Sequence, residues 1–232
     1  MKNKNPLSSS IEDYLKAIYQ LQEHGDTVTT TALAQELEIS AASATNMIKK
    51  LAGLRLAAHS PYQGVELTPA GKKIALEIVR HHRLIELFLH QALGIPWDEV
   101  HIEAHKLEHV LSDNLEDHIA DFLGDPKEDP HGDPIPTKAG IIADESKLAL
   151  ADLAPGDQVL IRRVSAQDPA RLRYLRELGL VPKAAVSVID SAPFDGPLRV
   201  RVGAVEHVLD RPLARQIWVT PRRKKKPQSN GK

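Results

Sequence analysis

The chain has 232 residues, with 30 Lys and Arg against 31 Asp and Glu, so any contact with nucleic acid depends on local basic patches rather than on net charge. It contains no cysteine, which excludes disulfides, thiolate zinc sites and iron–sulfur clusters. No apolar run approaches the ~20 residues of a membrane span, and the polar N-terminal stretch lacks the apolar core of a signal peptide. These features predict a cytoplasmic, largely globular protein with no membrane partner.

The first part of the chain has the pattern of a winged helix-turn-helix. Residues 9–24 carry an apolar stripe at helical spacing, and residues 29–37 and 41–54 predict two short helices joined by a polar turn. Residues 56–59 and 65–68 alternate around a turn that contains Pro and Gly, which predicts a β-hairpin, the wing.

The outer face of the second short helix suits a DNA-reading helix. Small side chains at its start allow a close approach to a major groove, Asn46 can pair with adenine, and lysines reach phosphates. Many helical hairpins share this spacing, so a scaffold without DNA contact is the alternative. The candidate DNA-binding residues are Ser40, Ala42, Ser43, Asn46, Lys49 and Lys50.

Two longer helices are predicted next. Thr68 and Pro69 have the types favoured at a helix start, and the helix should reach about Leu93. It is apolar on more than one face, which is typical of a helix that packs against its own domain and a second subunit. After a break at residues 94–96, Asp98 can cap another helix that runs to about Leu123.

This second long helix carries most of the candidate metal ligands. If this helix is uninterrupted, one face carries His101, His105, Glu108, His109 and Ser112, because their spacing returns to that face every turn. Each ligand alone has an ordinary explanation, such as a hydrogen-bonded core histidine or a first-turn acid. Together, on facing helices, they would leave many polar groups unpaired without a cation, which favours a divalent metal. The set is Asp13, His82, Glu86, His101, His105, Glu108 and His109.

An enzyme is not predicted. The zincin motif His-Glu-x-x-His is absent, because Glu103 follows His101 by two residues and would point about 200° away from it on a helix. The sequence has no Gly-rich phosphate loop and no nucleophile elbow. A metallohydrolase is therefore only a distant alternative, and no small-molecule substrate is expected.

The C-terminal part predicts a separate β domain. Residues 124–140 are rich in Pro, Gly and Asp and mark the main boundary, and a linker is expected after them. From about residue 153, five short alternating strands with one helix at residues 171–178 predict a small SH3-like β-barrel. The basic run that begins at Arg222 is expected to be a solvated tail or an additional DNA contact.

Four segments together resemble the diphtheria toxin repressor (DtxR) family of metal-dependent transcriptional repressors, and in particular its manganese-responsive, MntR-like branch. They are Ile11–Tyr19, His82–Glu86, Glu103–Asp113 and His131–Pro136. The resemblance implies a mainly α fold with small β parts. The expected divisions are a winged helix-turn-helix domain at 1–73, a helical dimerisation and metal-binding domain at 74–140, a linker at 141–152, an SH3-like (FeoA-like) domain at 153–221 and a basic tail at 222–232.

The resemblance also divides the ligands between two sites. A regulatory site would use Asp13, His105, Glu108 and His109, with His82 within reach. An ancillary site would use His82, Glu86 and His101, and Asp168 stands where iron-responsive relatives supply a carboxylate from the SH3-like domain. Arg171 stands where those relatives have a further ligand.

Three positions bear on the choice of metal. His105 replaces the Cys of iron-responsive members and the Glu common in manganese-responsive ones, and Asp13 replaces a Met of the former. Lys16 stands at a bridging Glu of some two-manganese relatives, which argues against a closely bridged pair. A donor set without sulfur favours Mn²⁺, with Fe²⁺ as the alternative, while its nitrogen ligands favour other divalent transition metals in vitro.

The predicted function is that of a metal-loaded homodimeric repressor. It would bind a palindromic double-stranded DNA operator when it holds Mn²⁺ and control genes of metal-ion homeostasis. Asp13 would connect the DNA-binding domain to the ligands of the dimerisation domain through the metal. An Fe²⁺-dependent repressor and a metal-buffering protein without a DNA role are the alternatives.

Overall fold

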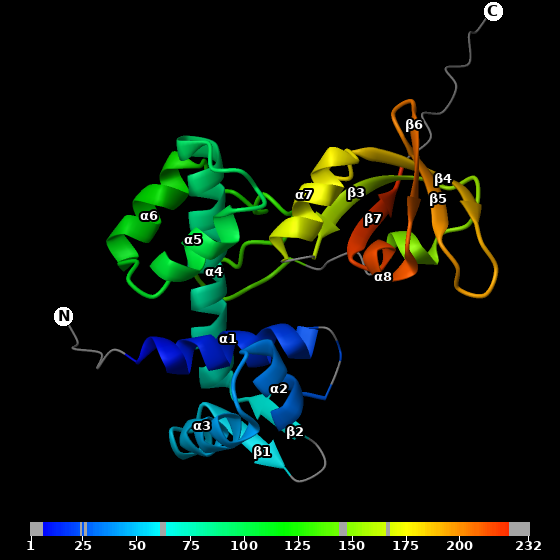
Figure 1. Cartoon of the computed structure of the whole chain (residues 1–232). Coiled ribbons are helices and arrows are strands. Elements are labelled where there is room, and N and C mark those ends of the chain that lie inside the picture. Colours follow the sequence, from blue (N-terminus) through cyan, green and yellow to red (C-terminus); the bar gives the residue numbers. More distant parts are fainter. Residues whose placement is uncertain are drawn as a thin grey trace, which may run out of the picture. The chain divides into compact units, whose positions relative to one another are not determined.

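The structure of the chain is a computed structural model that describes residues 7–23, 25, 27–60, 64–143, 148–165 and 168–222 (Figure 1). The chain forms two compact units, each made of several segments. The first unit contains Met1–Ile85, Ile102–Lys127 and Ile135–Ile142, and the second contains Glu86–His101, Glu128–Pro134 and Ala143–Lys232. Each unit is described by itself below.

The first unit begins with the predicted winged helix-turn-helix. Its elements are α1 (Ser9–Glu23), α2 (Thr30–Glu36), α3 (Ala41–Gly53), β1 (Ala57–Ser60) and β2 (Gly64–Leu67). The hydroxyls of Thr29 and Ser40 accept hydrogen bonds from the Ala32 and Ser43 amides at 3.0 and 3.1 Å, so both short helices start at an N-cap. β1 pairs antiparallel with β2, as expected of the wing, while residues 61–63 of the predicted turn lie outside the described residues.

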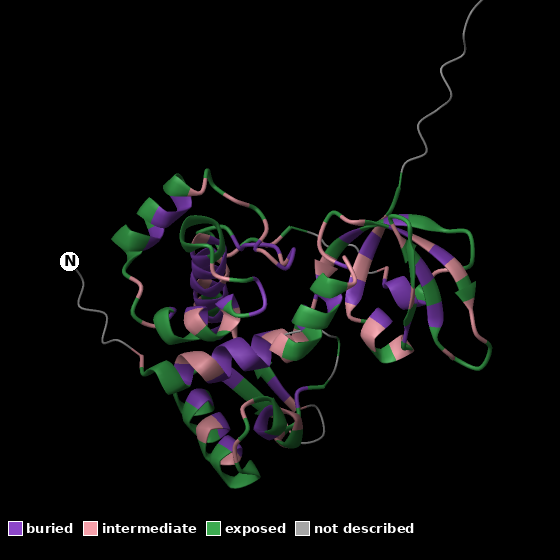
Figure 2. Cartoon of the chain, turned by 45° about the horizontal axis from the view of Figure 1, so that its top comes forward, coloured by how far each residue is buried: buried purple, intermediate pink, exposed green. Residues whose placement is uncertain are grey.

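The core of this unit forms because α1 places its apolar stripe against the winged helix. Leu15, Ile18, Leu33 and Leu51 are fully buried there, and Figure 2 shows the buried residues along α1. α4 (Pro69–Leu93) starts at the predicted position, with the Thr68 hydroxyl accepting from the Gly71 amide at 3.1 Å. The prediction of a long helix in this place is therefore confirmed.

Gly71 fixes how the start of α4 meets the wing. A Cβ at this position would lie 1.9 Å from the carbonyl oxygen of Leu56, so only glycine allows the approach. The apolar residues of α4 from Ala75 to Leu89 are mostly buried inside the chain itself rather than left free for a second subunit.

The prediction of one helix that continues to Leu123 is wrong. The chain forms α5 (Val100–Leu107) and α6 (Asp113–Phe122), with a turn between them. Ser112 does not lie on a ligand face but caps α6, its backbone extended at φ −81° and ψ 150° and its hydroxyl accepting from the Leu115 amide at 3.3 Å. Serine followed by an aspartate competes well with helix continuation, because its side chain satisfies an amide at a helix start.

The second unit contains the predicted strands and helix. Its elements are η1 (Leu150–Asp152), β3 (Gln158–Val164), α7 (Pro169–Glu177), β4 (Ala185–Ser191), β5 (Leu198–Val202), β6 (Val205–Leu209), α8 (Arg211–Ala214) and β7 (Ile217–Pro221). All strand pairs are antiparallel, in the order β6-β5-β4-β3-β7. The predicted SH3-like domain is confirmed, although among the described residues β6 and β7 are the edges, so its sheet is not closed into a barrel.

Segments outside the predicted β domain complete the core of this unit. Trp97 packs into the cluster of buried strand residues, and Asp98 accepts hydrogen bonds from Arg173 and Arg176 at 3.1 and 2.6 Å. The expected linker at 141–152 ends early, because Leu150 is fully buried in the same core.

The Pro- and Gly-rich segment at 124–140 has no helix or long strand, as predicted, but it is not one simple boundary. Its residues 128–134 pack with the strands, and both flanks belong to the first unit. Gly132 lies so close to β3 that a Cβ would be 2.0 Å from the Arg162 carbonyl oxygen, and its φ is +87°. The tail at 223–232 lies outside the described residues, and none of the described helices is long and apolar enough to cross a membrane.

Candidate metal centre

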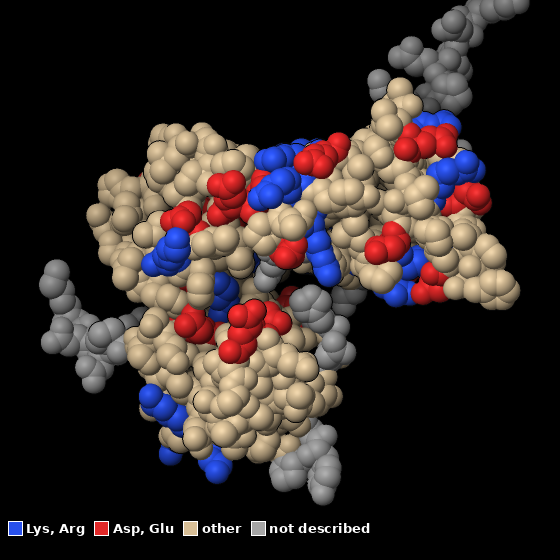
Figure 3. Space-filling view, viewed as in Figure 1, with Lys and Arg blue, Asp and Glu red and all other residues tan. Residues whose placement is uncertain are grey.

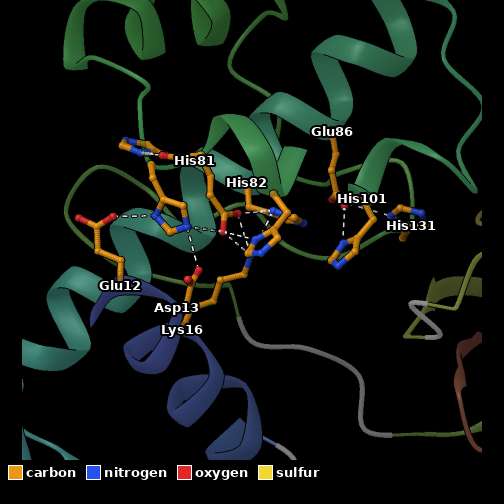
Figure 4. Close-up of polar contacts among 11 residues, drawn as sticks. Glu12, Asp13, Lys16, His81, His82, Glu86, His101 and His131 are labelled. Atoms are coloured by element: carbon orange, nitrogen blue, oxygen red, sulfur yellow. Dashed lines mark hydrogen bonds and ion pairs between the residues drawn. The ribbon is translucent and has the colours of Figure 1, made fainter. Parts of the chain in front are cut away.

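Four of the predicted ligands meet in the first unit. One ligand atom from each of Asp13, His105, Glu108 and His109 lies within 4.8 Å of the others. Asp13 comes from α1, His105 from α5, and Glu108 and His109 from the turn that follows α5. Figure 4 shows Asp13 projecting from α1 toward the histidine side chains. The turn, rather than one face of a long helix, brings Glu108 and His109 to this place.

The contacts within the cluster run through nitrogen and carboxylate oxygen. His109 Nε2 is 2.8 Å from Asp13 Oδ1 and 3.4 Å from Glu108 Oε1, and His105 Nδ1 is 2.9 Å from the same Glu108 oxygen. Two carboxylates and two imidazoles that converge in this way match the donors preferred by divalent transition metals, so the residues fit a metal ion. His105 is exposed and Glu108 is buried, which leaves one side of the cluster open to solvent.

Glu108 is an ionised carboxylate in the interior. Burial alone would raise its pKa, but the hydrogen bond from His82 and the charge of Lys16 outweigh that effect and hold the pKa well below the ordinary value. Lys16 Nζ lies 2.9 and 2.7 Å from the two carboxylate oxygens, and His82 Nδ1 also contacts the carboxylate. The sequence placed Lys16 only at the position of a bridging Glu in some relatives, and the structure shows that its ammonium group pairs with Glu108.

The main chain of Glu108 is also held by α4. The ring nitrogen Nδ1 of His81 lies 3.2 Å from the Glu108 carbonyl oxygen and must donate to it, while Nε2 is 3.5 Å from a carboxylate oxygen of Glu116 on α6. Glu116 in turn accepts from Arg80. This chain of contacts fixes the turn between α5 and α6.

Glu12 is a functional candidate that the sequence reasoning missed. Its Oε2 is 2.7 Å from Nδ1 of His109, the nitrogen opposite the one that faces Asp13 (Figure 4). A carboxylate in this place keeps the proton on Nδ1 and leaves Nε2 for a metal, which is the usual role of a partner to a metal-binding histidine. Its position next to Asp13 was the available signal.

We expect Glu12→Gln to weaken Mn²⁺ binding by about 10- to 100-fold, because an amide can donate to Nδ1 and favour the wrong tautomer of His109. Fluorescence or calorimetric titration of the metal-free protein would measure the dissociation constant. Glu23→Gln, an exposed position at the end of α1, serves as the matched control. Equal affinities in all three proteins would contradict the role given to Glu12.

The other predicted ligands are arranged differently. His101 Nδ1 lies 3.1 Å from Glu86 Oε1 in the second unit, so this pair of the expected ancillary site is present. Glu86, Asp129 and His131 form another buried group of possible ligands. Burial alone would lower the pKa of His131, but the hydrogen bond and charge of Glu86 and the charge of Asp129 raise it to about 9. His131 is thus a second internal cation beside a predicted ligand.

Asp168 belongs to no group of possible ligands found among the described residues. It is the N-cap of α7, where its Oδ1 accepts from the Arg171 amide at 2.8 Å. An aspartate followed by proline at the first helical position is a strong start signal, and this local role explains the residue. The structure therefore does not support Asp168 as a ligand.

The candidate DNA-binding residues all lie on or next to α3. Ser40, Ala42, Ser43, Asn46, Lys49 and Lys50 are all exposed. Figure 3 shows Lys and Arg side chains gathered at the α3 end of this part of the chain, on the face in view. The hydroxyl of Ser40 caps α3 and contacts that of Ser43, whereas the other four side chains project into solvent, where a nucleic-acid duplex can reach them.

Comparison with known proteins assigns the chain to a family. Residues 6–65 match the N-terminal DNA-binding domain of the iron-dependent repressors, and residues 68–137 match their metal-binding and dimerisation domain. Residues 148–221 match the FeoA domain. The iron-dependent repressor IdeR of Mycobacterium bovis is 31% identical over 227 residues, which cover 93% of this chain and 98% of the relative. The chain belongs to the DtxR/IdeR family of iron-dependent repressors.

Other relatives agree with this family. The diphtheria toxin repressor of Corynebacterium diphtheriae is 30% identical over 206 residues, 88% of this chain and 86% of the relative. A solved manganese-dependent transcriptional repressor in complex with manganese superposes with a TM-score of 0.86 at 39% identity, over 91% of this chain and 99% of the other. The solved structure of ScaR with bound Cd²⁺ superposes with a TM-score of 0.81 at 33% identity, over 91% of this chain and 99% of the other. As a member of the family the chain is a metal-dependent transcriptional repressor, and its homologues are not enzymes.

Proposed function

We propose that this repressor is activated by Mn²⁺ in preference to Fe²⁺, and that the activated homodimer binds a palindromic operator near genes of metal-ion homeostasis. The observation that carries the proposal is the origin of the ligands: Asp13 lies on α1 of the DNA-binding part, whereas His105 lies on α5 and Glu108 and His109 lie in the turn that follows it. A bound divalent ion would supply two positive charges that hold the ligands from both segments together.

The choice of Mn²⁺ rests on the donors. Asp13 and Glu108 offer hard oxygens, and none of the four residues of the cluster carries sulfur. The two imidazoles leave Fe²⁺ as the alternative and predict strong binding of Co²⁺, Ni²⁺ and Zn²⁺ in vitro. The similarity to a manganese-dependent repressor in complex with manganese supports the same ranking.

For the ancillary site we propose Glu86 and His101 with His82, which precedes Glu86 by one turn of α4. The expected contribution of Asp168 is not part of this proposal, because its carboxylate caps α7. The domain limits given above for the winged helix, the helical domain and the SH3-like domain are proposed as functional divisions, although the packing units follow different limits.

A homodimer is supported by apolar side chains on the first unit. Ile102, Leu107, Val110, Leu115 and Phe122 are between 42% and 75% exposed and come from α5, α6 and the turn that joins them. Several large apolar side chains gathered in one segment of a soluble protein are typical of an interface between subunits. A dimer would also present two α3 helices to the two halves of a palindrome.

One titration tests the activating metal. A duplex selected from a random-sequence library by the Mn²⁺-loaded chain would serve as the operator, and its binding would be measured against free Mn²⁺ and, anaerobically, free Fe²⁺. We expect activation at free Mn²⁺ concentrations plausible in a cell and a higher requirement for Fe²⁺. Activation by Fe²⁺ alone in that range would reverse the assignment. Metal binding with no selected duplex would favour the metal-buffering alternative.

Lys49→Ala should weaken operator binding to a similar degree for all sequences and reduce the slope of log K against log salt by about 1, because Lys49 lies exposed on α3 and would neutralise one phosphate. Fluorescence anisotropy at several salt concentrations measures both quantities. Lys127→Ala, an exposed lysine outside the winged helix, is the control. An unchanged slope in Lys49→Ala would remove α3 from the DNA contact.

A further inference from the structure

We propose that Lys16 is a resident cation of the metal centre, which occupies one side of the Glu108 carboxylate. A single metal ion then binds on the other side, and it binds less tightly than the same ligands would bind it alone. This inference rests on the proposed function for the identity of the ligands. It adds a residue that sets the metal concentration at which the repressor responds.

The contacts of Lys16 place it inside the cluster. Its Nζ lies 2.9 and 2.7 Å from the two oxygens of Glu108 and 3.2 Å from Nδ1 of His82, and its side chain is 9% exposed. The two carboxylate oxygens of Glu108 accept from the ammonium group, and His82 Nδ1, which donates to the same carboxylate, lies beside it. Lys16 is thus buried inside the cluster rather than a surface side chain that rests on the site (Figure 4).

The geometry divides the Glu108 carboxylate into two sides. Oε1 faces His105 at 2.9 Å and His109 at 3.4 Å, whereas Oε2 faces His82, and Lys16 contacts both oxygens with the shorter distance to Oε2. A metal held by Asp13, His105 and His109 would therefore share Glu108 through Oε1. The place where a second cation could use Oε2 and His82 is taken by the ammonium group.

Charge then determines the affinity. A divalent ion on Oε1 would lie a few ångströms from Nζ, in a place where Glu108 is fully buried and screening by solvent is weak. Like charges this close repel, so Lys16 opposes metal binding although it stabilises Glu108 in the metal-free protein. Lys16 lies one turn after Asp13 on α1, so the same helix face supplies both a ligand and the charge that opposes the metal.

An ordinary buried ion pair would behave differently. If Lys16 only supported the fold, its loss would lower stability and weaken metal binding together, because the ligands would lose their order. The resident-cation hypothesis requires opposite signs: the metal-free protein becomes less stable, and the metal binds more tightly. These two quantities can be measured separately.

The experiment compares the full chain with Lys16→Met, Lys16→Gln and Lys16→Arg. The dissociation constant for Mn²⁺ would be followed by the electron paramagnetic resonance signal of free Mn²⁺, and the stability of the metal-free protein by its urea midpoint. We expect Lys16→Met and Lys16→Gln to lower the urea midpoint and to tighten Mn²⁺ binding at least about tenfold. Lys16→Arg, which keeps the charge, should stay close to the wild-type affinity.

Lys106→Met is the matched control, because Lys106 lies next to His105 but pairs with Glu103 at the surface, where both side chains are about half exposed. It should change neither quantity. If Lys16→Met does not fold without metal, refolding by Mn²⁺ below the wild-type dissociation constant supports the inference, and absence of refolding there contradicts it. Unchanged or weaker Mn²⁺ binding in a folded Lys16→Gln variant overturns it.

A separate variant distinguishes a failure of the inference about Lys16 from a failure of the proposed function. His109→Ala removes a proposed ligand without touching Lys16. If His109→Ala binds Mn²⁺ as the wild type does, the proposed centre itself is wrong. If His109→Ala loses Mn²⁺ binding but Lys16→Gln keeps the wild-type dissociation constant, the centre stands and only the role of Lys16 fails.

Discussion

Replacing Asp13 by alanine is expected to abolish Mn²⁺-dependent operator binding while the protein stays folded and dimeric. Asp13 is the proposed ligand on α1, and its Oδ1 lies 2.8 Å from His109 Nε2. Because the other three ligands lie within residues 105–109, the variant removes the connection through metal between α1 and that segment. We expect Mn²⁺ affinity to fall by about 100-fold or more, at or beyond the upper end seen when only a partner of a ligand is lost.

Three measurements on Asp13→Ala check this expectation: Mn²⁺ titration, gel shift on the selected operator, and sedimentation equilibrium. Asp117→Ala removes an exposed aspartate on α6 that pairs with Lys138, and it should leave all three unchanged. A gel shift that keeps its wild-type dependence on Mn²⁺ in Asp13→Ala would show that α1 does not take part in metal sensing.

Glu108→Gln should lower the free energy of unfolding of the metal-free protein by about 3–5 kcal/mol. The side chain of Glu108 is fully buried, and its charge balances the ammonium group of Lys16 at 2.7 Å. A neutral amide leaves that ammonium buried without a counter-ion, which costs far more than the loss of a surface pair. Urea denaturation in the presence of a chelator measures the difference.

The difference in free energy of unfolding between the wild type and Glu108→Gln should depend on pH. The folded-state pKa of Glu108 lies below its ordinary value of 4.5, so its ionised form contributes stability that is fully present above the unfolded-state pKa. This contribution is lost progressively as the pH falls below about 5 toward the lowered folded-state pKa, so the stabilities of the two proteins should approach each other over that range. Glutamine does not titrate, so the variant lacks this part of the pH dependence.

Glu103→Gln is the control for this comparison. Glu103 lies on α5 and pairs with Lys106 at 2.7 Å, but both side chains are exposed to solvent. Its replacement should cost no more than about 1 kcal/mol. If Glu108→Gln lowered the free energy of unfolding as little as this control does, the buried ion pair would not stabilise the turn between α5 and α6.

The sequence by itself predicts much of the fold because the signals are local. Apolar spacing predicts the starts of α2 and α3, and Thr68 with Pro69 predicts that of α4, to within a residue or two. Alternating residues predict the strands of the second unit. The candidate metal ligands could also be predicted where they are close in sequence, since His105, Glu108 and His109 lie within one short segment.

Only the tertiary structure decided how these residues are used. Continuing a helix through Ser112 or capping a new one there differs by about 1 kcal/mol, so packing around the turn settles the outcome. Asp168 likewise caps its own helix and belongs to none of the groups of possible ligands among the described residues. Local patterns list the candidates in such cases, but they do not rank a local partner against a distant one.

The partners of the buried charges depend on the tertiary structure most of all. Glu108 and Lys16 are separated by 92 residues, and Glu12 and His109 by 97. A cluster of imidazoles and carboxylates in a sequence indicates that some cation is required, because a buried charge without a counter-charge is unstable. Whether that cation is a metal ion, a lysine or both is decided by which helices fold against one another, and in this protein α1 brings Lys16 as well as Asp13 to the same carboxylate.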